Sequence, residues 1–324
     1  MKGTESAAKK RPLVVFAVVN WNQCQLTLDC LASLREQTYP NFSVVLVDNG
    51  SVDGSAGAVR EQFPEVTVLE NGRNLGIAGA NNVGIRWALD AGADYVFLLN
   101  NDTIVDSDML DHLVRVTEAD PTIGMAGPTM LFFDQPETIW CAGNSIDWNS
   151  GETNRLREGD SLSTVREADL EEVDFITSCA VLIKRAVFEQ VGLMDERYFI
   201  YYDETDWFAR ASASGWRSVY VPWARMWHKV SASMGESSPR TDYYMIRNRF
   251  LFLSKNLDGF HKAFSLTWAA ARNLKIIAAY TLKNRTAKRL ANRDAKYLGL
   301  RDAIVGRWGE MGPDVSVVCN RTHQ

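Results

Sequence analysis

The sequence lacks the features that mark a membrane-spanning, secreted or disulfide-stabilised protein. Its 324 residues contain no uncharged apolar run of about 18 residues, the length that a spanning helix needs, so no membrane span is expected. Residues 1–11 are polar and have no apolar core, so we do not expect a signal peptide. The five cysteines are an odd number with no C-x-x-C spacing. This pattern argues against a zinc site or a disulfide scaffold and predicts a reducing, cytoplasmic compartment.

The sequence also lacks an overall excess of positive charge and the common phosphate-binding motifs. Its formal net charge is −5, so nucleic acid is not expected as a partner. The pattern G-x-x-x-x-G-K-[ST] is absent, and Gly76-x-x-Gly79 is not the complete G-x-G-x-x-G fingerprint. A P-loop protein and a dinucleotide-dependent dehydrogenase are therefore disfavoured.

Positive charge is instead concentrated near the end of the chain. Residues 259–297 carry nine Lys or Arg and one acidic residue, so this segment is +8 and the rest of the chain is −13. The segment would lie on an anionic membrane rather than cross it, which predicts a protein peripheral to the inner face of the membrane. Alternatively it is a packed helix with a solvated basic face, or the contact of a homodimer.

The remaining composition, 46% hydrophobic and 23% charged, is that of one large globular domain, alone or with an appendage. Buried strands are predicted at the apolar runs 13–19, 44–47, 66–69 and 95–99. Helical spacing lies between them, at 26–37, 59–63 and 76–91. This alternation predicts right-handed crossovers and a parallel sheet.

Polar side chains follow these predicted strands. Three of the four strands end in a loop that carries Asp or Asn, and all the ends lie on one edge of the sheet, where open α/β folds bind ligands. The run 95–99 leads into Asn100-Asn101-Asp102, and Asp102 is a hard oxygen ligand of the kind that binds Mg²⁺ or Mn²⁺ with substrate phosphates. Alternatively, Asp102 caps the helix that is expected from about Ser107.

The second half of the chain is less regular. Strands are predicted at 124–127, 175–183 and 219–221, with strands rather than helix in 132–166 and a hairpin turn at 147–151. Helices are predicted at 185–191, 204–214, 243–257 and 260–282. The last dozen residues are expected to be loose.

Several motifs of the chain resemble those of the inverting family 2 glycosyltransferases, especially the rhamnosyltransferase-like branch. The resemblance covers roughly residues 13–256. Its motifs are Val19-Asn20-Trp21-Asn22, 48–55, Asn74-Leu75-Gly76 with Gly79 and Asn81, 99–103, 203–206 and His228. The resemblance implies a GT-A fold, which is an α/β fold with a Rossmann-like, mostly parallel sheet flanked by helices, here followed by a C-terminal helical extension.

The resemblance also implies a nucleotide-diphosphate sugar donor and a divalent metal, Mg²⁺ or Mn²⁺, which neutralises the leaving diphosphate. It assigns the metal to Asp102 and His228, although the family often has Asp-x-Asp where this chain has Asn100-Asn101-Asp102. It implies nucleotide-sugar binding by Asn20, Asn22, Asp48, Ser51, Asp53, Asn74, Gly76, Gly79, Asn81 and Asn101. Alternatively, Asp48 only orders its turn, Asp53 caps the next helix and His228 is structural.

The family's catalytic base is a carboxylate of a Glu-Asp pair at the start of a helix, and here the pair is reversed. The match places Glu204 in the position of the base, with Asp203 as the reserve candidate. The alternative is that these acids only complement the helix dipole.

The implied organisation is a GT-A domain at 12–240, with a nucleotide-sugar half at 12–130 and an acceptor and base half at 131–240. A helical extension follows at 241–312, and residues 1–11 and 313–324 are expected to be flexible. The implied reaction moves rhamnose from dTDP-rhamnose to a glycan or lipid-linked glycan. A UDP-hexose or galactofuranose donor, a non-catalytic sugar-nucleotide- or partner-binding homologue and a sugar-nucleotide pyrophosphorylase are the alternatives. A pyrophosphorylase would normally have a Gly-rich loop that this sequence lacks.

Overall fold

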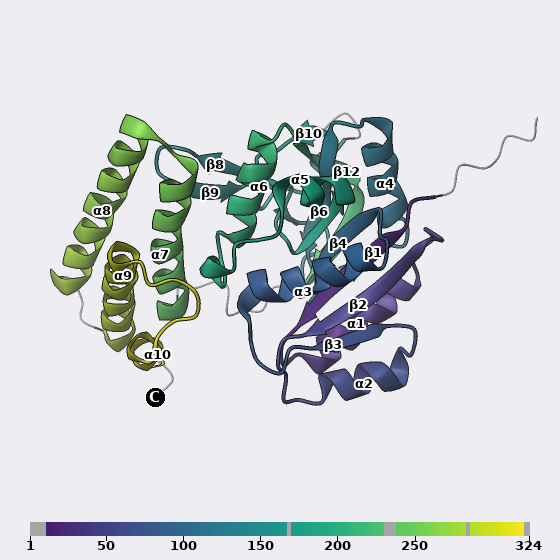
Figure 1. The fold of residues 1–324 in the computed structure, drawn as a ribbon, viewed down its shortest axis with the longest axis horizontal. Helices are drawn as coiled ribbons and strands as arrows, with labels where there is room; N and C mark the ends of the chain where they lie inside the picture. The colour runs from purple at the N-terminus through teal and green to yellow at the C-terminus, as the bar shows by residue number, and fades with distance from the viewer. Residues whose placement is uncertain (1–10, 167–169, 230–237, 283–285, 321–324) are drawn as a thin grey trace, which may run out of the picture.

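The computed structural model describes residues 11–166, 170–229, 238–282 and 286–320. A central sheet runs in the order β10-β12-β6-β11-β4-β1-β2-β3, with β5 paired to β12 and β7 paired to β6, while β8 and β9 form a separate hairpin (Figure 1). The strands are β1 (Val14–Asn20), β2 (Phe42–Asp48), β3 (Thr67–Glu70), β4 (Tyr95–Asn100), β5 (Thr103–Val105), β6 (Ile123–Phe132), β7 (Ile139–Cys141), β8 (Asn144–Asp147), β9 (Glu152–Arg155), β10 (Glu171–Glu172), β11 (Ala180–Lys184) and β12 (Arg217–His228).

The first four strands form the parallel half of the sheet, as the strand–helix alternation predicts. Strand β1 pairs in parallel with β2 and β4, and β2 with β3. The connecting helices are α1 (Cys24–Arg35), α2 (Ser55–Gln62) and α3 (Gly76–Asp90). Residues 95–99 are buried without interruption, because β4 lies in the middle of a sheet with both faces covered.

Three strand predictions in the second half are wrong in extent. The strand expected at 175–183 is only β11, which pairs antiparallel with β4, and residues 177–179 turn toward helix α6 (Asp203–Ala213) instead. The strand expected at 219–221 is the twelve-residue β12, and His228 is its last residue rather than a residue beyond it. Strand β6 likewise extends well past 124–127. These extensions depend on pairing between β12 and β6, which are far apart in the sequence.

Helices α4 (Met109–Ala119), α5 (Arg185–Val191) and α6 flank the sheet, and the hairpin turn expected at 147–151 joins β8 to β9. Four helices follow: α7 (Pro239–Asn256), α8 (Gly259–Leu282), α9 (Ala287–Val305) and α10 (Pro313–Cys319) (Figure 1). Residues 313–319 were expected to be loose, and this is wrong, because α10 buries Val315 and Cys319. Residues 1–10 and 321–324 lie outside the described residues. Helix α7 contributes Leu251, Phe252 and Leu253 to the same hydrophobic core as the sheet.

Candidate active site

The carboxyl ends of β1, β2 and β4 meet at one edge of the sheet. The parallel register pairs Asn20 at the end of β1 with Asp48 at the end of β2, and Val19 with Asn100 at the end of β4. Asn20, Asp48 and Asn101 are buried. Residues from three separate loops are therefore brought together, as the strand order implies.

A network of buried amides joins these loops. The Asn101 amide donates to Asn20 Oδ1 at 3.0 Å and to Thr27 Oγ1 at 2.9 Å. The Asn20 amide donates in turn to Asp48 Oδ2 at 3.0 Å and Ser51 Oγ at 3.1 Å. Thr27 also donates to Asn20 Oδ1 at 2.9 Å. Thr27 was not among the sequence candidates, because a threonine in an amphipathic helix carries no local signal of this contact.

The loop after β2 is ordered by its own acidic and amide groups. Asp48 Oδ1 accepts the backbone N–H groups of Gly50 at 3.1 Å and Ser51 at 2.8 Å. Asn22 Oδ1 accepts the N–H of Val52 at 2.8 Å, and Ser51 Oγ accepts the N–H of Asn22 at 2.9 Å. The Asp48 carboxylate thus orders its turn, which is the alternative considered for it.

Asp53 also holds backbone groups. Its Oδ2 accepts the N–H of Cys24, the first residue of α1, at 2.9 Å, and its Oδ1 accepts the N–H of Ser55 at the start of α2 at 3.1 Å. One carboxylate therefore satisfies unpaired N–H groups at the N-termini of two helices.

Asn49, which the sequence candidates omit, organises the loop after β3. Its amide donates to Asn74 Oδ1 at 3.1 Å, and its Oδ1 accepts the N–H of Leu75 at 2.9 Å. Asn74 Oδ1 also accepts the N–H of Gly76 at 2.8 Å. The side chains of Asn49 and Asn74 are thus engaged within the loop, directly before helix α3.

Gly76 is required by a close contact between distant segments. Its φ of +75° is in the left-handed region, and a Cβ built there would lie 2.3 Å from the carbonyl oxygen of Phe199. That carbonyl accepts the N–H of Ile77 at 2.6 Å. The absence of a side chain at Gly76 lets the segment that leads into α6 approach closely, a structural requirement separate from the nucleotide-sugar binding that the resemblance implies.

Two further candidates face the protein interior. A Cβ on Gly79 would lie 2.8 Å from the Cβ of Leu75. Asn81 is buried, and its amide lies 3.9 Å from the sulfur of Met194. These contacts account for both residues through packing.

The two candidate metal ligands lie next to each other. Antiparallel pairing of β5 with β12 places His228 opposite Thr103, and His228 Nε2 lies 3.1 Å from Asp102 Oδ1. The imidazole packs against Trp140, with ring centres 4.4 Å apart. His228 Nδ1 is buried and has no hydrogen-bond partner within the described ranges.

This pair fits a divalent cation only as part of a larger set of ligands. Carboxylate oxygen and imidazole nitrogen are suitable donors, and Nε2 is the ring nitrogen that faces Asp102 Oδ1. No group of three His, Cys, Asp or Glu side chains that could hold a metal occurs in the described part of the chain. Further ligands would have to come from the substrate or from water.

The candidate base lies at the start of α6. Glu204 Oε2 accepts the backbone N–H of Ser178 at 2.6 Å and lies 3.3 Å from the hydroxyl of Thr177. Asp203 is buried, and its Oδ2 has no partner among the described residues. Burial raises the pKa of both carboxyls, and the Glu204 charge raises that of Asp203 further, while the bonds from Ser178 and Thr177 lower that of Glu204.

Cys179 connects the candidate base with the candidate metal site. Its carbonyl accepts the N–H of Asn100 at 3.0 Å. Burial raises the pKa of its thiol, and the negative charges of Asp102 and Glu204 both contribute. The neighbouring N–H of Ser178 binds Glu204 Oε2, so residues 178–179 link the candidate base to the end of β4.

Arg155, at the end of β9, is a further charged residue near the base. Its guanidinium lies 4.9 Å from the ring centre of Trp140, and its charge lowers the pKa of Glu204. It also forms a 2.6 Å ion pair with Glu158. The sequence of the irregular segment 132–166 did not indicate that Arg155 would lie near Glu204, because these two residues are brought together only by tertiary packing.

The segment before the base has an unusual backbone. Phe199, Tyr201 and Tyr202 have φ values of +65°, +64° and +66°, a region that bulky residues rarely adopt. Buried Asn248 on α7 donates to three carbonyls of this segment, those of residues 198, 200 and 201, at 2.8–2.9 Å. Helix α7 therefore stabilises the strained approach to Glu204.

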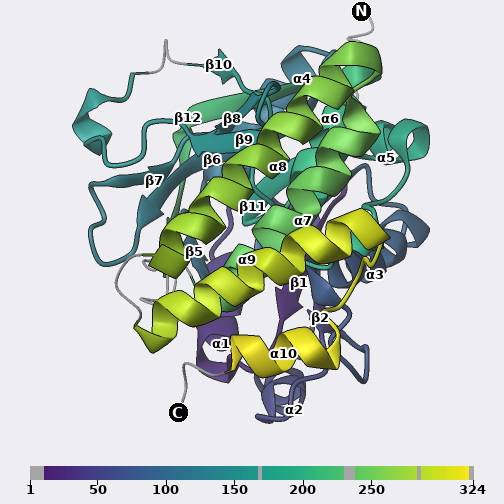
Figure 2. The same ribbon diagram turned by 90° about the vertical axis from the view of Figure 1, so that its left-hand side faces the viewer.

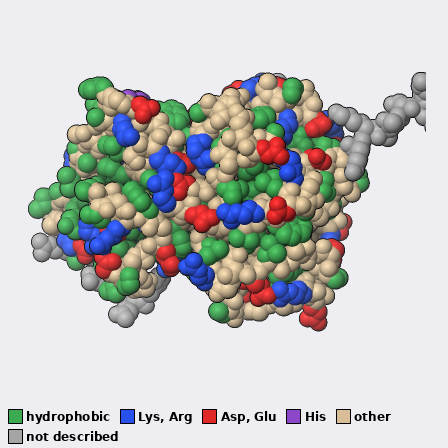
Figure 3. Space-filling model, in the orientation of Figure 1, with side chains coloured by type: hydrophobic (Ala, Val, Ile, Leu, Met, Phe, Trp, Pro, Cys, Tyr) green, Lys and Arg blue, Asp and Glu red, His purple; other side chains and the backbone are tan. Residues whose placement is uncertain are grey.

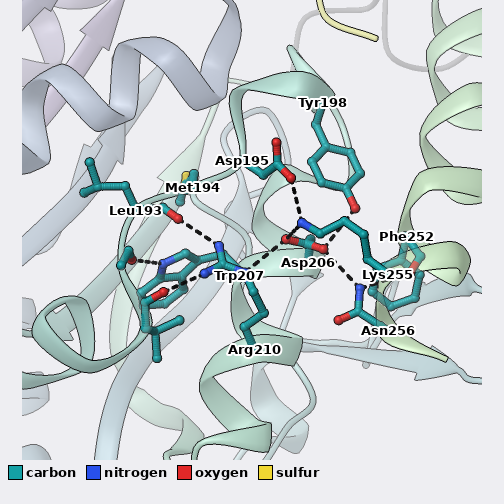
Figure 4. Close-up of polar contacts among 12 residues, drawn as sticks. Leu193, Met194, Asp195, Tyr198, Asp206, Trp207, Arg210, Phe252, Lys255 and Asn256 are labelled. Carbon is teal, nitrogen blue, oxygen red and sulfur yellow. Dashed lines mark hydrogen bonds and ion pairs between the residues drawn. The ribbon is translucent and has the colours of Figure 1, made fainter. Parts of the chain in front are cut away.

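A second contact joins α7 to α6 (Figure 4). Buried Asp206 accepts hydrogen bonds at Oδ1 from Tyr198 and Asn256, both at 3.0 Å. Its Oδ2 accepts from Arg210 at 3.2 Å and Lys255 at 2.7 Å. Asp206 thus links α6 to α7, beyond complementing the dipole of its helix.

The sheet, with acidic and amide side chains gathered at the carboxyl edge of its parallel strands, has the GT-A fold. The chain belongs to glycosyl transferase family 2, whose model matches residues 16–192. Its activity is therefore glycosyl transfer, as the resemblance implies. This family is not that of the pyrophosphorylase considered as an alternative.

Similar proteins agree with this class. The chain is 29% identical over 268 residues to the N-acetylglucosaminyl-diphospho-decaprenol L-rhamnosyltransferase of Mycobacterium tuberculosis, covering 76% of this chain and 85% of that protein. It is 29% identical over 252 residues to the dTDP-rhamnosyl transferase RfbF of Shigella flexneri, covering 75% and 80%. A mannosyltransferase from Pyrobaculum calidifontis, solved in complex with GDP-Man and Mn²⁺, shares the fold with a TM-score of 0.55 and 18% identity, covering 97% and 87%.

Proposed function

We propose that the protein transfers rhamnose, with inversion, from dTDP-rhamnose to a glycan or lipid-linked glycan. Two relatives are rhamnosyltransferases by name, one of them acting on a diphospho-decaprenol acceptor and one on a dTDP-linked sugar. The observation that carries the proposal is the placement of three residues around the end of β4: Asp102 contacts His228, and Glu204 binds the N–H of Ser178, next to Cys179, whose carbonyl binds Asn100. A UDP-hexose or galactofuranose donor is the alternative.

In this proposal Asp102 and His228 hold a divalent cation, Mg²⁺ or Mn²⁺. When bound, the cation supplies positive charge for the leaving diphosphate. The nucleotide lies against loops that are ordered by seven of the candidate residues: Asn20, Asn22, Asp48, Ser51, Asp53, Asn74 and Asn101. Helix α3 beside these loops is packed through Gly76, Gly79 and Asn81.

Glu204 is the proposed base. The acceptor oxygen attacks the anomeric carbon as the bond from that carbon to the diphosphate oxygen breaks, the acceptor proton passes to Glu204, and the nucleoside diphosphate leaves. The ionised Glu204 is stabilised by the N–H of Ser178 and the hydroxyl of Thr177. Asp203 Oδ2 has no such donor in the described part of the chain, and Asp203 is neutral while Glu204 is charged.

A thermal-shift screen tests the donor and the metal together. We expect dTDP-rhamnose to raise the melting temperature of the wild type only when Mg²⁺ or Mn²⁺ is present, because binding to the folded state alone stabilises it. We expect Asp102→Ala to lose the shift and Asp90→Asn, at the exposed end of α3, to keep it. A shift with a UDP-sugar and none with dTDP-rhamnose would overturn the proposed donor, and equal shifts in Asp102→Ala would overturn the metal site.

A further inference from the structure

The outer face of α8 exposes a continuous apolar surface. The helix has 24 residues, of which only Ser265, Ala269 and Asn273 are buried, and these three lie on one face. The opposite face carries the exposed residues Phe260, Phe264, Trp268, Ala271, Leu274 and Leu282, which we call the α8 face. From Phe260 to Leu274 they are three or four residues apart, and Leu282 follows after eight, so all of them align along one side of the helix.

The side chains of this face are large and strongly exposed. Phe260 is 85% exposed and Leu282 is 84% exposed, at opposite ends of the helix. Phe260 and Phe264 stack on each other, with ring centres 6.3 Å apart. Single exposed apolar residues are common, but a row of this length indicates a surface that another apolar medium covers. In Figures 1 and 2, α8 lies at the outside of the molecule, with α9 beside it.

Positive charge accompanies the apolar side chains. Lys275 lies on the α8 face, and Arg272 borders it with its guanidinium 5.2 Å from the ring centre of Trp268. Arg272 also pairs with Glu152, whereas Lys275 forms no ion pair with any residue that the structure describes. Over residues 259–297 the only acidic residue is Asp294, which pairs with Arg293. Figure 3 shows hydrophobic and basic side chains together on the α8 side of the molecule.

We propose that the α8 face docks the protein on an anionic lipid surface, with α8 lying in the plane of the interface. An apolar row with basic residues beside it fits the acyl boundary and the anionic headgroups together. The helix would rest on the membrane, because none of the helices traced here has the length and apolarity needed to cross one.

A second copy of the chain is a poorer occupant. A symmetric dimer through this face would bring two segments of +8 charge against each other, and like charges at an interface are unfavourable. The rest of the chain carries a charge of −13 and would be repelled by anionic headgroups. This repulsion would orient the molecule with the basic segment 259–297 toward the lipid. This inference does not depend on which sugar is transferred.

Co-sedimentation of the full chain with vesicles tests the proposal. We expect binding to vesicles of phosphatidylglycerol and phosphatidylethanolamine and much weaker binding to phosphatidylcholine alone. High salt should reduce binding, because screening shortens the range of the attraction. The double variant Phe264→Glu with Leu274→Glu should lower the ratio of bound to free protein by about tenfold or more, since it removes apolar area and adds negative charge.

Matched variants separate the two contributions. Lys275→Glu should weaken binding to the anionic vesicles, and Lys275→Arg should retain it. Val317→Glu, at an exposed apolar position of α10 outside the α8 face, should bind like the wild type. Circular dichroism and donor-dependent thermal shift should be unchanged in all four proteins, because the substituted side chains are exposed and lie outside the active site.

Three results would overturn the proposal. The wild type would stay in the supernatant with anionic vesicles, or the double Glu variant would sediment as the wild type does. The third result combines two measurements. Light scattering would show a wild-type dimer that the double variant Phe264→Glu with Leu274→Glu converts to a monomer, and the wild type would not bind vesicles.

Discussion

The two sides of the active-site edge are built differently. On the side of β1 and β2, the polar groups bind one another: Asn20 and Asp48 use both polar atoms of their side chains in hydrogen bonds within the protein. On the side of α6 and β12, two buried polar atoms, Asp203 Oδ2 and His228 Nδ1, have no partner in the described ranges. The first side is a preorganised support, and the second holds the groups that can bind a ligand or a proton.

The backbone shows the same contrast. The segment before Glu204 contains three bulky residues with positive φ, whereas on the support side the one such residue in the described loops is Asn22, a type that adopts this region readily. Strain of this kind persists only where surrounding structure imposes it, and Asn248 supplies the donors that do so. Strain and unsatisfied polar atoms thus occur together near the proposed chemistry.

Removing the base should have the largest effect. Glu204→Gln keeps the size of the side chain but cannot take a proton, so we expect the transfer rate to fall by about 10²–10⁴-fold. Donor binding in the thermal-shift assay should be retained. Asp203→Asn serves as the matched control and should lose less activity. A variant Glu204→Gln that transfers at the wild-type rate would exclude this residue as the base.

The second largest effect is expected from removing the hydrogen bonds that hold the strained segment before Glu204. Asn248→Ala removes the shared donor to the carbonyls of residues 198, 200 and 201, and within the described segments only the first of these has a second donor, Arg247. We expect the free energy of unfolding to fall by about 1–3 kcal/mol, because carbonyls in a partly buried segment lose their hydrogen bonds. Because the segment leads into α6, kcat should fall while the KM for the donor changes little. Ser51→Ala, on the side of β1 and β2, should raise the KM for the donor and change kcat little. Equal changes of kcat in both variants would erase the contrast between the two sides.

Asp203 should make stability depend on pH. Its pKa is raised by burial and by the Glu204 charge, so the folded state holds a proton that the unfolded state releases above its ordinary pKa. The free energy of unfolding therefore falls as pH rises from that ordinary value to the raised one, by about 1.4 kcal/mol per pH unit. Urea unfolding should show a smaller fall for Asp203→Asn than for wild type, with Asp90→Asn as the control for lost charge. An unchanged pH dependence would contradict the burial of an acid there.

The smallest expected effect is that of Arg155. Its charge lowers the pKa of Glu204, so Arg155→Met should raise that pKa. The proposed base must be ionised to accept a proton, so we expect the acidic limb of the pH–rate profile to move to higher pH. Arg155→Lys keeps the charge and should leave the limb close to its wild-type position. A shift to lower pH in Arg155→Met would show that Arg155 does not act on the base.

Much of the first half could be predicted from the sequence. Uninterrupted apolar runs such as 95–99 indicate buried strands, and alternation with helices implies their parallel order. The approach of Asp102 to His228 was suggested by motif order alone, and their role as metal ligands stays a prediction. The roles of Glu204 and Asp203 also stay predictions.

The second half could not be predicted to the same extent. The end of β12 and the turn at 177–179 depend on which strands pair, and this pairing leaves no periodic pattern in the local sequence. Gly76 illustrates the same limit. The sequence shows that a small residue is there, but its contact with the carbonyl of Phe199 comes from a segment more than a hundred residues away.

The sequence by itself determined the class of fold, the family and the residue types available at the edge of the sheet, because burial periodicity and motif spacing are local properties of the chain. Only the tertiary structure decided which buried polar atoms have hydrogen-bond partners. Asp48 and Asp203 are both buried carboxylates, yet Asp48 receives three donors, whereas one oxygen of Asp203 has no partner among the residues that the structure describes. The turn supplies two of the donors to Asp48, but the third comes from Asn20 on β1, and the donors to Glu204 come from residues 177 and 178, so packing between distant segments decides which of these carboxylate oxygens are paired.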